Sequence, residues 1–163
     1  MLFLQINTKI SMAIKEGDKA PYFEGFDQNG TLVKSSDFLG KKLVLYFYPK
    51  DSTPGCTAES CDLRDNYESF LAKGFAVVGV NIGSASSHKK FAEKYALPFS
   101  LIADEDQKIV SDYGVWREKK LYGKSFMGIV RTTFVIDEKG NIEKVFSKVD
   151  TKNHSNQIFA NYQ

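Results

Sequence analysis

The chain has 163 residues, with 22 lysines and arginines against 20 aspartates and glutamates, so its formal net charge is +2. Hydrophobic residues make up 42% and charged residues 26%, which excludes a disordered protein, and the small net charge gives no support for a binder of nucleic acid or of anionic membranes. The length predicts one domain, with a core large enough to need neither a disulfide nor a structural zinc ion, and no run of about 18 apolar residues predicts a membrane span.

The N-terminal segment lacks the features of a secretory signal. The first eleven residues contain a short apolar patch, but they have no basic region and no small-residue cleavage site before Met12, which we interpret as an alternative start. We therefore expect residues 1–13 to form a poorly ordered N-terminal extension, residues 14–163 to form a single domain, and the protein to be cytoplasmic.

The first predicted element is an N-terminal β-hairpin. A turn over residues 27–30, which ends in Asn29-Gly30, separates two short extended segments, Tyr22–Phe26 and Thr31–Val33. Four apolar runs of four to seven residues follow, each bounded by turn-forming residues, and these predict buried strands. The predicted strands are Leu43–Tyr48, Phe75–Val80, Phe99–Ala103 and Thr132–Ile136.

Segments with helical periodicity lie between and after the predicted strands. They are Thr57–Lys73, Ser86–Tyr95, Lys108–Tyr113 and a closing helix at about Asn153–Tyr162. The alternation of strands and helices predicts an α/β domain with helices on both faces of the sheet. A turn at residues 137–141 adds a second hairpin, from Thr132–Ile136 to Ile142–Phe146. This order predicts a thioredoxin-like fold with a central mixed sheet flanked by helices.

The chain contains two cysteines, Cys56 and Cys61, and the first lies where a strand gives way to a helix. Thr53 suits the N-cap position and Pro54 the first helical position, which places Cys56 in the first turn. Free backbone amides and the positive end of the helix dipole favour a thiolate there, and the thiolate is the reactive form. A cysteine that only fills the core is the common alternative, but its position together with the second cysteine favours reactivity.

The spacing of the cysteines limits what they can do together. Five residues apart on one helix, their Cα atoms are about 8–9 Å apart, whereas a disulfide needs about 7 Å or less. We therefore expect a bond between them only after the first turns unwind. Zinc binding is disfavoured because the cysteines and the two histidines, His88 and His154, lack the spacing of zinc ligands. We interpret both histidines as solvated helix residues.

Attack of a thiolate on a peroxide develops charge on both oxygens, so fixed donors are needed around them. Thr53 supplies a hydroxyl, and a permanent cation would complete the pocket. The candidate is Arg131, because a guanidinium presents its donors as a rigid fork, although an arginine leading into a strand is often only an edge charge. Lys50 and Arg64 are competing cations, which we interpret as solvated.

The motif Pro49-x-x-x-Thr53-x-x-Cys56 resembles the active-site signature of the peroxiredoxins. The longer string from Tyr46 to Cys61 resembles the bacterioferritin-comigratory protein, or peroxiredoxin Q, branch of that family. The resemblance extends from about Lys15 to the C-terminus. It includes the segments Gly17–Pro21, Ser36–Lys41, Tyr113–Trp116 and Val130–Asp137.

This resemblance implies a thioredoxin-like fold and a thiol-dependent peroxidase. Cys56 then matches the peroxidatic cysteine, which attacks hydrogen peroxide or an organic hydroperoxide and becomes a sulfenic acid. Thr53 and Arg131 match the residues that hold the peroxide and activate the thiolate, and Pro49 shields the pocket from water. Cys61 matches the resolving cysteine, which forms an intramolecular disulfide.

The resemblance also implies a supporting role for Glu59, which would orient an arginine. Thioredoxin or a similar dithiol reductant would reduce the disulfide, the role would be antioxidant defence, and no metal, haem or flavin is needed. Because both cysteines lie in one chain, we expect a monomer or a weakly associated dimer, with neither nucleic acid nor a membrane as a partner.

Two rival functions use the same residues. A redox sensor or interaction protein would use the Cys56–Cys61 bond to change its surface, and sustained peroxide turnover would distinguish the enzyme from it. A disulfide oxidoreductase acting on proteins would need an exposed Cys-x-x-Cys, which the sequence lacks.

Overall fold

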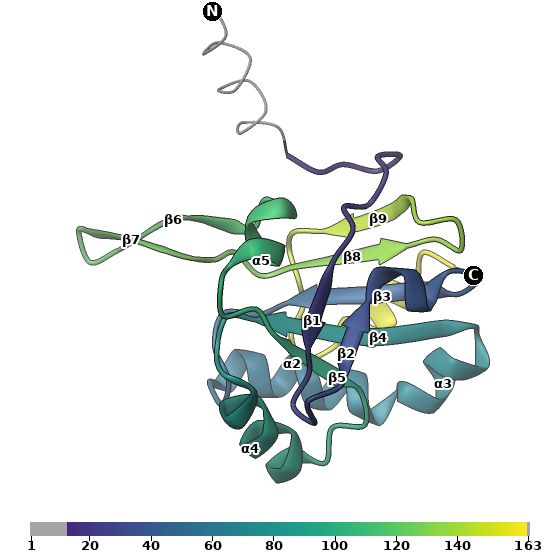
Figure 1. Ribbon diagram of the computed structural model, residues 1–163, viewed down its shortest axis with the longest axis horizontal. Coiled ribbons are helices and arrows are strands. Elements are labelled where there is room, and N and C mark those ends of the chain that lie inside the picture. The colour runs from purple at the N-terminus through teal and green to yellow at the C-terminus, as the bar shows by residue number, and fades with distance from the viewer. Residues whose placement is uncertain (1–12, 163) are drawn as a thin grey trace, which may run out of the picture.

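The computed structural model describes residues 13–162 and is built around a five-stranded mixed sheet (Figure 1). The strands lie in the order β5-β4-β3-β8-β9, with β3 parallel to β4 and antiparallel to β8. This confirms the predicted central mixed sheet. The strand bounds are β3 Lys42–Phe47, β4 Phe75–Asn81, β5 Ser100–Ala103, β8 Thr132–Ile136 and β9 Ile142–Phe146.

The central strand β3 is buried on both faces because its side chains alternate between two hydrophobic clusters. Leu43, Leu45 and Phe47 belong to one cluster. Val44 and Tyr46 belong to the other, on the opposite face of the sheet. An apolar residue is therefore needed at every position, which explains the continuous apolar run in the sequence.

The helices cover the two faces unequally. Leu63, Phe70, Phe91 and Ile158 bring α2, α3, α4 and α6 against the Tyr46 face, and the other face is covered by α5 and the N-terminal strand pair. The strand pair is antiparallel, as predicted. The bounds are α2 Pro54–Asp65, α3 Tyr67–Ala72, α4 Ala85–Tyr95, α5 Lys108–Asp112, α6 His154–Phe159, β1 Glu24–Phe26, β2 Leu32–Lys34 and the 3-10 helix η1 Ser35–Phe38.

The prediction of one helix over Thr57–Lys73 is wrong. Helix α2 begins at Pro54 and ends at Asp65, and Asn66 separates it from α3. The side-chain amide of Asn66 donates a hydrogen bond to the carbonyl oxygen of Asp62, in competition with the regular helical pattern. In α3, Phe70 is fully buried, whereas Leu71 is 50% exposed.

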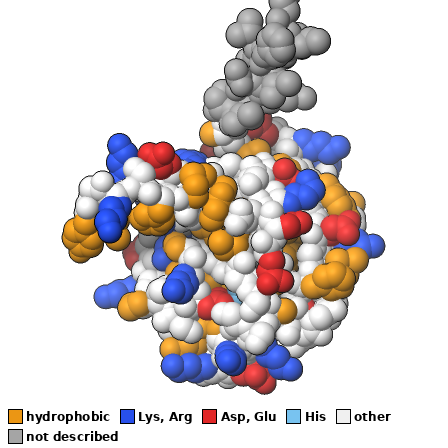
Figure 2. Space-filling view, turned by 60° about the vertical axis from the view of Figure 1, so that its left-hand side comes forward, with side chains coloured by type: hydrophobic (Ala, Val, Ile, Leu, Met, Phe, Trp, Pro, Cys, Tyr) orange, Lys and Arg blue, Asp and Glu red, His pale blue; other side chains and the backbone are white. Residues whose placement is uncertain are grey.

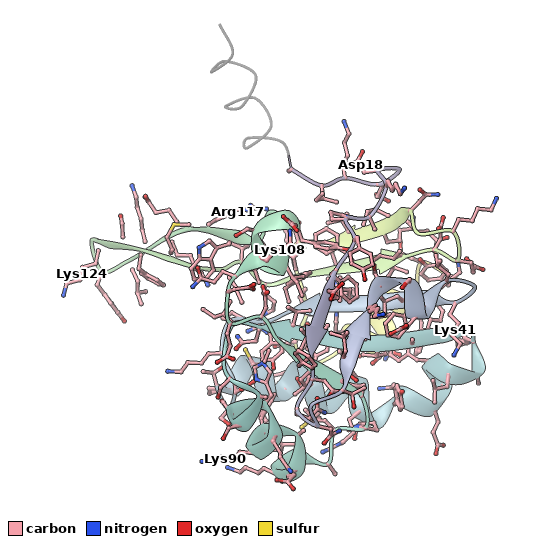
Figure 3. The ribbon with its side chains drawn as sticks, in the orientation of Figure 1. Asp18, Lys41, Lys90, Lys108, Arg117 and Lys124 are labelled. Atoms are coloured by element: carbon pink, nitrogen blue, oxygen red, sulfur yellow. The ribbon has the colours of Figure 1, made fainter. Side chains whose placement is uncertain are left out.

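A third hairpin, β6 Trp116–Leu121 with β7 Lys124–Ile129, was not predicted. Tyr122 and Gly123 at its tip both have positive φ, which suits a tight hairpin turn. The hairpin projects from the body, and Figure 2 shows hydrophobic and basic side chains gathered on it, with Lys124 at its tip in Figure 3. Most of its residues are exposed and only Ile129, at its base, is buried, so its strands carry no alternating pattern of burial.

The predicted extension over residues 1–13 lies almost entirely outside the described residues. Over residues 13–162, no helix is long and apolar enough to cross a bilayer.

Candidate functional site

Cys56 lies in the first turn of α2, directly after the loop that follows β3, and its side chain is fully buried. Thr53 is the N-cap residue, as predicted, but its hydroxyl donates to the carbonyl oxygen of Lys50 at 2.8 Å and does not cap the helix. Because no side chain caps the helix, its first amides remain available to a negative charge at the sulfur.

Arg131 reaches Cys56 from the neighbouring strand of the sheet. It immediately precedes β8, and the pairing of Phe47 with Thr132 places the end of β3 beside the start of β8. Nη2 of Arg131 lies 3.4 Å from Sγ of Cys56, and Nη1 lies 2.6 Å from Oε1 of Glu59. One guanidinium therefore contacts the thiol and the carboxylate.

The environment keeps Arg131 charged. Burial alone would lower its pKa, but Glu59 and Cys56 more than compensate, and the pKa of Arg131 is raised. Among the competing cations, Lys50 is exposed, and Arg64 donates to Asp65 and to the carbonyl oxygen of Tyr95.

Glu59 is fully buried beside Arg131, and only one of its oxygens is paired. Oε1 accepts the hydrogen bond from Arg131, whereas Oε2 has no hydrogen-bond partner among the described residues. Burial raises the pKa of Glu59 to about 7, against the lowering effect of Arg131. The charge of Glu59 is therefore sensitive to its immediate neighbours near neutral pH.

The interpretation of His88 as a solvated residue is wrong, because its ring is fully buried between α4 and the sheet. Its Nδ1 lies 2.6 Å from Oδ2 of Asp51, and its Nε2 lies 3.1 Å from the carbonyl oxygen of Ile102. The hydroxyls of Tyr48 and Ser87 also donate to Asp51. Burial would raise the pKa of Asp51, but these partners together lower it. The hydrogen bond between Asp51 and His88 fixes the loop between β3 and α2 to α4.

The same interpretation is wrong for His154, which is also fully buried. Its Nδ1 lies 2.8 Å from Oε1 of Gln157, and its Nε2 lies 2.8 Å from Oγ1 of Thr133 and 3.8 Å from Oε2 of Glu59. Burial lowers the pKa of His154. Helix α6 therefore places the imidazole of His154 next to Glu59, the residue that holds Arg131.

Cys61 lies on the same continuous helix, and both cysteines are free thiols. Burial raises the pKa of Cys61, partly offset by Arg64. Pro49 is half-buried in the loop before Cys56, and its carbonyl oxygen accepts a hydrogen bond from the side chain of Asn81. Asn81 also binds the carbonyl oxygen of Tyr48, so β4 holds the start of the loop.

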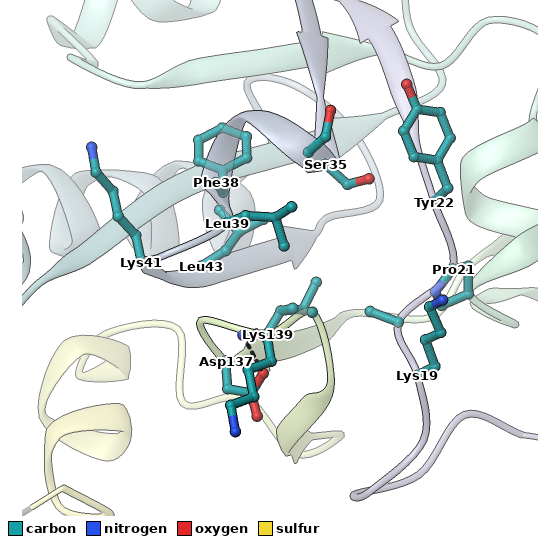
Figure 4. Close-up of a pocket in the computed structure, with 14 residues that line it drawn as sticks. Lys19, Pro21, Tyr22, Ser35, Phe38, Leu39, Lys41, Leu43, Asp137 and Lys139 are labelled. Atoms are coloured by element: carbon teal, nitrogen blue, oxygen red, sulfur yellow. Dashed lines mark hydrogen bonds between the residues drawn. The ribbon is translucent and has the colours of Figure 1, made fainter.

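Sequence reasoning missed Asp51, Asn81 and the burial of the two histidines. Within residues 13–162, no group of three histidine, cysteine or acidic side chains could hold a metal ion. A cavity of about 330 Å³ lies beside Leu43, at the end of β3 opposite to Cys56, and is not part of this site (Figure 4).

Comparison with known proteins gives consistent matches. A sequence model of the AhpC/TSA family matches residues 16–145. Peroxiredoxin Bcp of Bacillus subtilis (strain 168) is 48% identical over 143 residues, covering 88% of this chain and 91% of that protein. Peroxiredoxin Bcp of Escherichia coli (strain K12) is 43% identical over 145 residues, covering 89% and 93%.

Solved structures agree with the sequence matches. The bacterioferritin comigratory protein of Xanthomonas campestris, described for its alkyl peroxide reduction activity, has a TM-score of 0.80 at 34% identity, covering 85% of this chain and 88% of that one. BcpB of Mycobacterium tuberculosis has a TM-score of 0.80 at 34% identity, covering 90% and 95%. The thioredoxin-like fold is thereby confirmed. The chain belongs to the peroxiredoxins, in the bacterioferritin-comigratory protein or peroxiredoxin Q branch, and is a thiol peroxidase that uses a thiol reductant.

Proposed function

We propose that Cys56 is the peroxidatic cysteine and that Arg131 activates it. The observation that carries this assignment is the guanidinium of Arg131, which contacts Sγ of Cys56 at 3.4 Å while Glu59 holds its other end at 2.6 Å. A fixed positive charge stabilises the thiolate and then the charge that develops on the peroxide oxygens.

In the first step, the thiolate of Cys56 attacks one peroxide oxygen. A sulfur–oxygen bond forms, the oxygen–oxygen bond breaks, and the leaving oxygen takes a proton and departs as water or an alcohol. Arg131 and the free amides of the first turn of α2 supply donors to the reacting oxygens. Thr53 adds its hydroxyl once this turns from the carbonyl of Lys50, and Pro49 keeps water from the pocket.

In the second step, Cys61 attacks the sulfur of the Cys56 sulfenic acid, and the oxygen leaves as water while the disulfide forms. The first turns of α2 must unwind for this to happen. The far end of the helix is held to α6, because the backbone amide of Ser155 donates to the carboxylate of Asp62 at 2.7 Å. Unwinding is therefore confined to the segment between the two cysteines.

The disulfide is returned to two thiols by an external dithiol, for which we propose thioredoxin in the cytoplasm. Both cysteines belong to one chain, which supports a monomer as the working unit, with at most weak dimerisation. The substrates are hydrogen peroxide and organic hydroperoxides. Sustained turnover would distinguish this enzyme from a peroxide sensor that reacts once.

Two variants test the assignment in an assay with peroxide, thioredoxin and its reductase. Cys56→Ser should consume no peroxide. Cys61→Ser should consume one equivalent and then stop turning over efficiently. Full turnover by Cys56→Ser would contradict the proposal.

A further inference from the structure

The unpaired oxygen of Glu59 is the starting point. Oε2 is buried and has no hydrogen-bond partner among the described residues, while Oε1 accepts from Arg131. A buried carboxylate oxygen without a donor is costly, so it is expected either to carry a proton or to lie near a group that does. A proton on Glu59 would therefore sit on Oε2, on the side turned away from Arg131.

The group that faces this oxygen is the imidazole of His154, whose Nε2 lies 3.8 Å away. Its tautomer follows from its partners. The side-chain nitrogen of Gln157 donates to the carbonyl oxygen of Lys148, which turns the amide oxygen of Gln157 towards Nδ1 of His154. Nδ1 must then carry a hydrogen, and in the neutral ring Nε2 is the acceptor, bound to the hydroxyl of Thr133 at 2.8 Å.

Oε2 of Glu59 and Nε2 of His154 thus face each other. Besides the hydrogen on Nδ1 of His154, the two residues hold one further proton, which either of them can carry. Burial raises the pKa of Glu59 to about 7 and lowers that of His154, so the proton lies mainly on Glu59. The charged and titratable groups around Glu59 are Arg131, Asp62, Cys56 and Tyr46, and those around His154 are Asp62, Arg131 and Asp150.

We propose that Glu59 and His154 act as one proton-holding pair that decides how much of the positive charge of Arg131 is available to Cys56. With the proton in place, Glu59 is neutral, and the guanidinium acts chiefly on the sulfur. Once the proton is lost, the carboxylate competes with the thiolate for the same cation. His154 is therefore a positioning residue for the peroxidase reaction. This inference rests on the proposed role of Cys56.

Two substitutions separate the members of the pair. Glu59→Gln keeps an acceptor for Arg131 and places an amide towards His154, but cannot become an anion. His154→Asn removes the imidazole that can take the proton from Glu59, so Glu59 keeps this proton to higher pH. Asn156→Ala, exposed on α6, is the matched control.

The first readout is the pH at which iodoacetamide alkylates Cys56 at half its maximal rate, followed by mass spectrometry of the Cys56 peptide. We expect this midpoint to move on the order of one pH unit lower in Glu59→Gln, and to move lower by a smaller amount in His154→Asn. A purely structural role would lower the alkylation rates without moving either midpoint. Alkylation at Cys61 in place of Cys56 would refute the proposed role of Cys56. The Glu59–His154 pair would then be tested by the second readout alone.

The second readout is the NMR titration of the histidine rings in untagged protein. The chain has two histidines, and the His154 signals are identified by through-bond correlation of the ring protons with the assigned His154 backbone. We expect their pH midpoint to differ between the wild type and Glu59→Gln, and to be unchanged in Asn156→Ala. An identical His154 titration in the wild type and Glu59→Gln would overturn the proposal, even if His154→Asn does not fold.

Discussion

Nη2 of Arg131 lies 3.4 Å from Sγ of Cys56, although 75 residues separate them in the chain. The contact depends on the antiparallel pairing of β3 and β8, which brings the start of β8 to the end of β3. Charge on the sulfur and charge on the guanidinium are therefore coupled by the topology of the sheet, and catalysis is expected to fail when either group is removed.

Arg131→Met tests this coupling directly. We expect the rate of Cys56 oxidation to fall about 10²–10³-fold, because a donor and a fixed charge at the reacting oxygens are lost. Arg131→Lys should recover only part of the loss, since an ammonium cannot contact Glu59 and Cys56 as a fork. Stopped-flow measurement of a single oxidation gives the rate, and a rate for Arg131→Met within a factor of two of the wild type would contradict the role of this residue.

Gly55 has no side chain, and this leaves space for the guanidinium of Arg131. A Cβ atom at this position would lie 3.1 Å from Nη2 of Arg131, so Gly55→Ala should displace the guanidinium by a few tenths of an ångström. Alanine also favours the helix by about 1 kcal/mol over glycine, which opposes unwinding. We expect slower oxidation of Cys56 and slower formation of the disulfide with Cys61, measured separately by quenched mass spectrometry. Unchanged rates for both steps would show that neither effect matters.

The hydrogen bond between His88 and Asp51 predicts a large loss of stability when it is broken. His88→Ala leaves the Asp51 carboxylate, whose side chain is only 7% exposed, without its imidazole partner. The expected decrease in the free energy of unfolding is about 3–5 kcal/mol, measured by denaturant titration at pH 7. Lys90→Ala, on the exposed face of the same helix (Figure 3), is the control and should be nearly neutral. Equal stability of the two variants would argue against the pair.

Glu59 and His154 predict opposite pH dependences of stability in two single variants. The pKa of Glu59 is raised from 4.5 to about 7 on folding, so its contribution to stability is lost as the pH rises through this interval. The pKa of His154 is lowered from 6.5, so its contribution is lost as the pH falls below this value. In the wild type these two contributions change in opposite directions with pH wherever both groups titrate.

Relative to the wild type, Glu59→Gln should therefore become more stable as the pH rises from 4.5 to 6.5, since only His154 then titrates. His154→Asn should become less stable over the same interval, by up to about 3 kcal/mol. Denaturant titrations at several pH values measure both slopes. Parallel profiles for the wild type and both variants would show that the pKa values of Glu59 and His154 do not change on folding.

The parts of the fold that the sequence predicted are those encoded locally. Strands β8 and β9 have the predicted bounds, because a turn at residues 137–141 separates two apolar runs. The position of Cys56 in the first helical turn followed from Thr53-Pro54. In the hairpin β6–β7 only Ile129 is buried, so the sequence carries no pattern that separates this hairpin from a loop.

The pairing of Glu59 with His154 could not be predicted, because these residues meet only when α6 packs against α2. A lone histidine on a short helix carries no signal of burial. The same holds for His88, whose partner Asp51 lies 37 residues away. Long-range polar contacts depend on tertiary packing, whereas the cysteine motif is a feature of one segment.

The most direct test of the mechanism is peptide mapping by mass spectrometry after one equivalent of peroxide is added to reduced protein. The wild type should lose two hydrogens in a link between Cys56 and Cys61 of the same chain, and Cys61→Ser should carry one added oxygen on Cys56. Oxygen found on Cys61 with Cys56 still a thiol, or a link between two chains, would contradict the account.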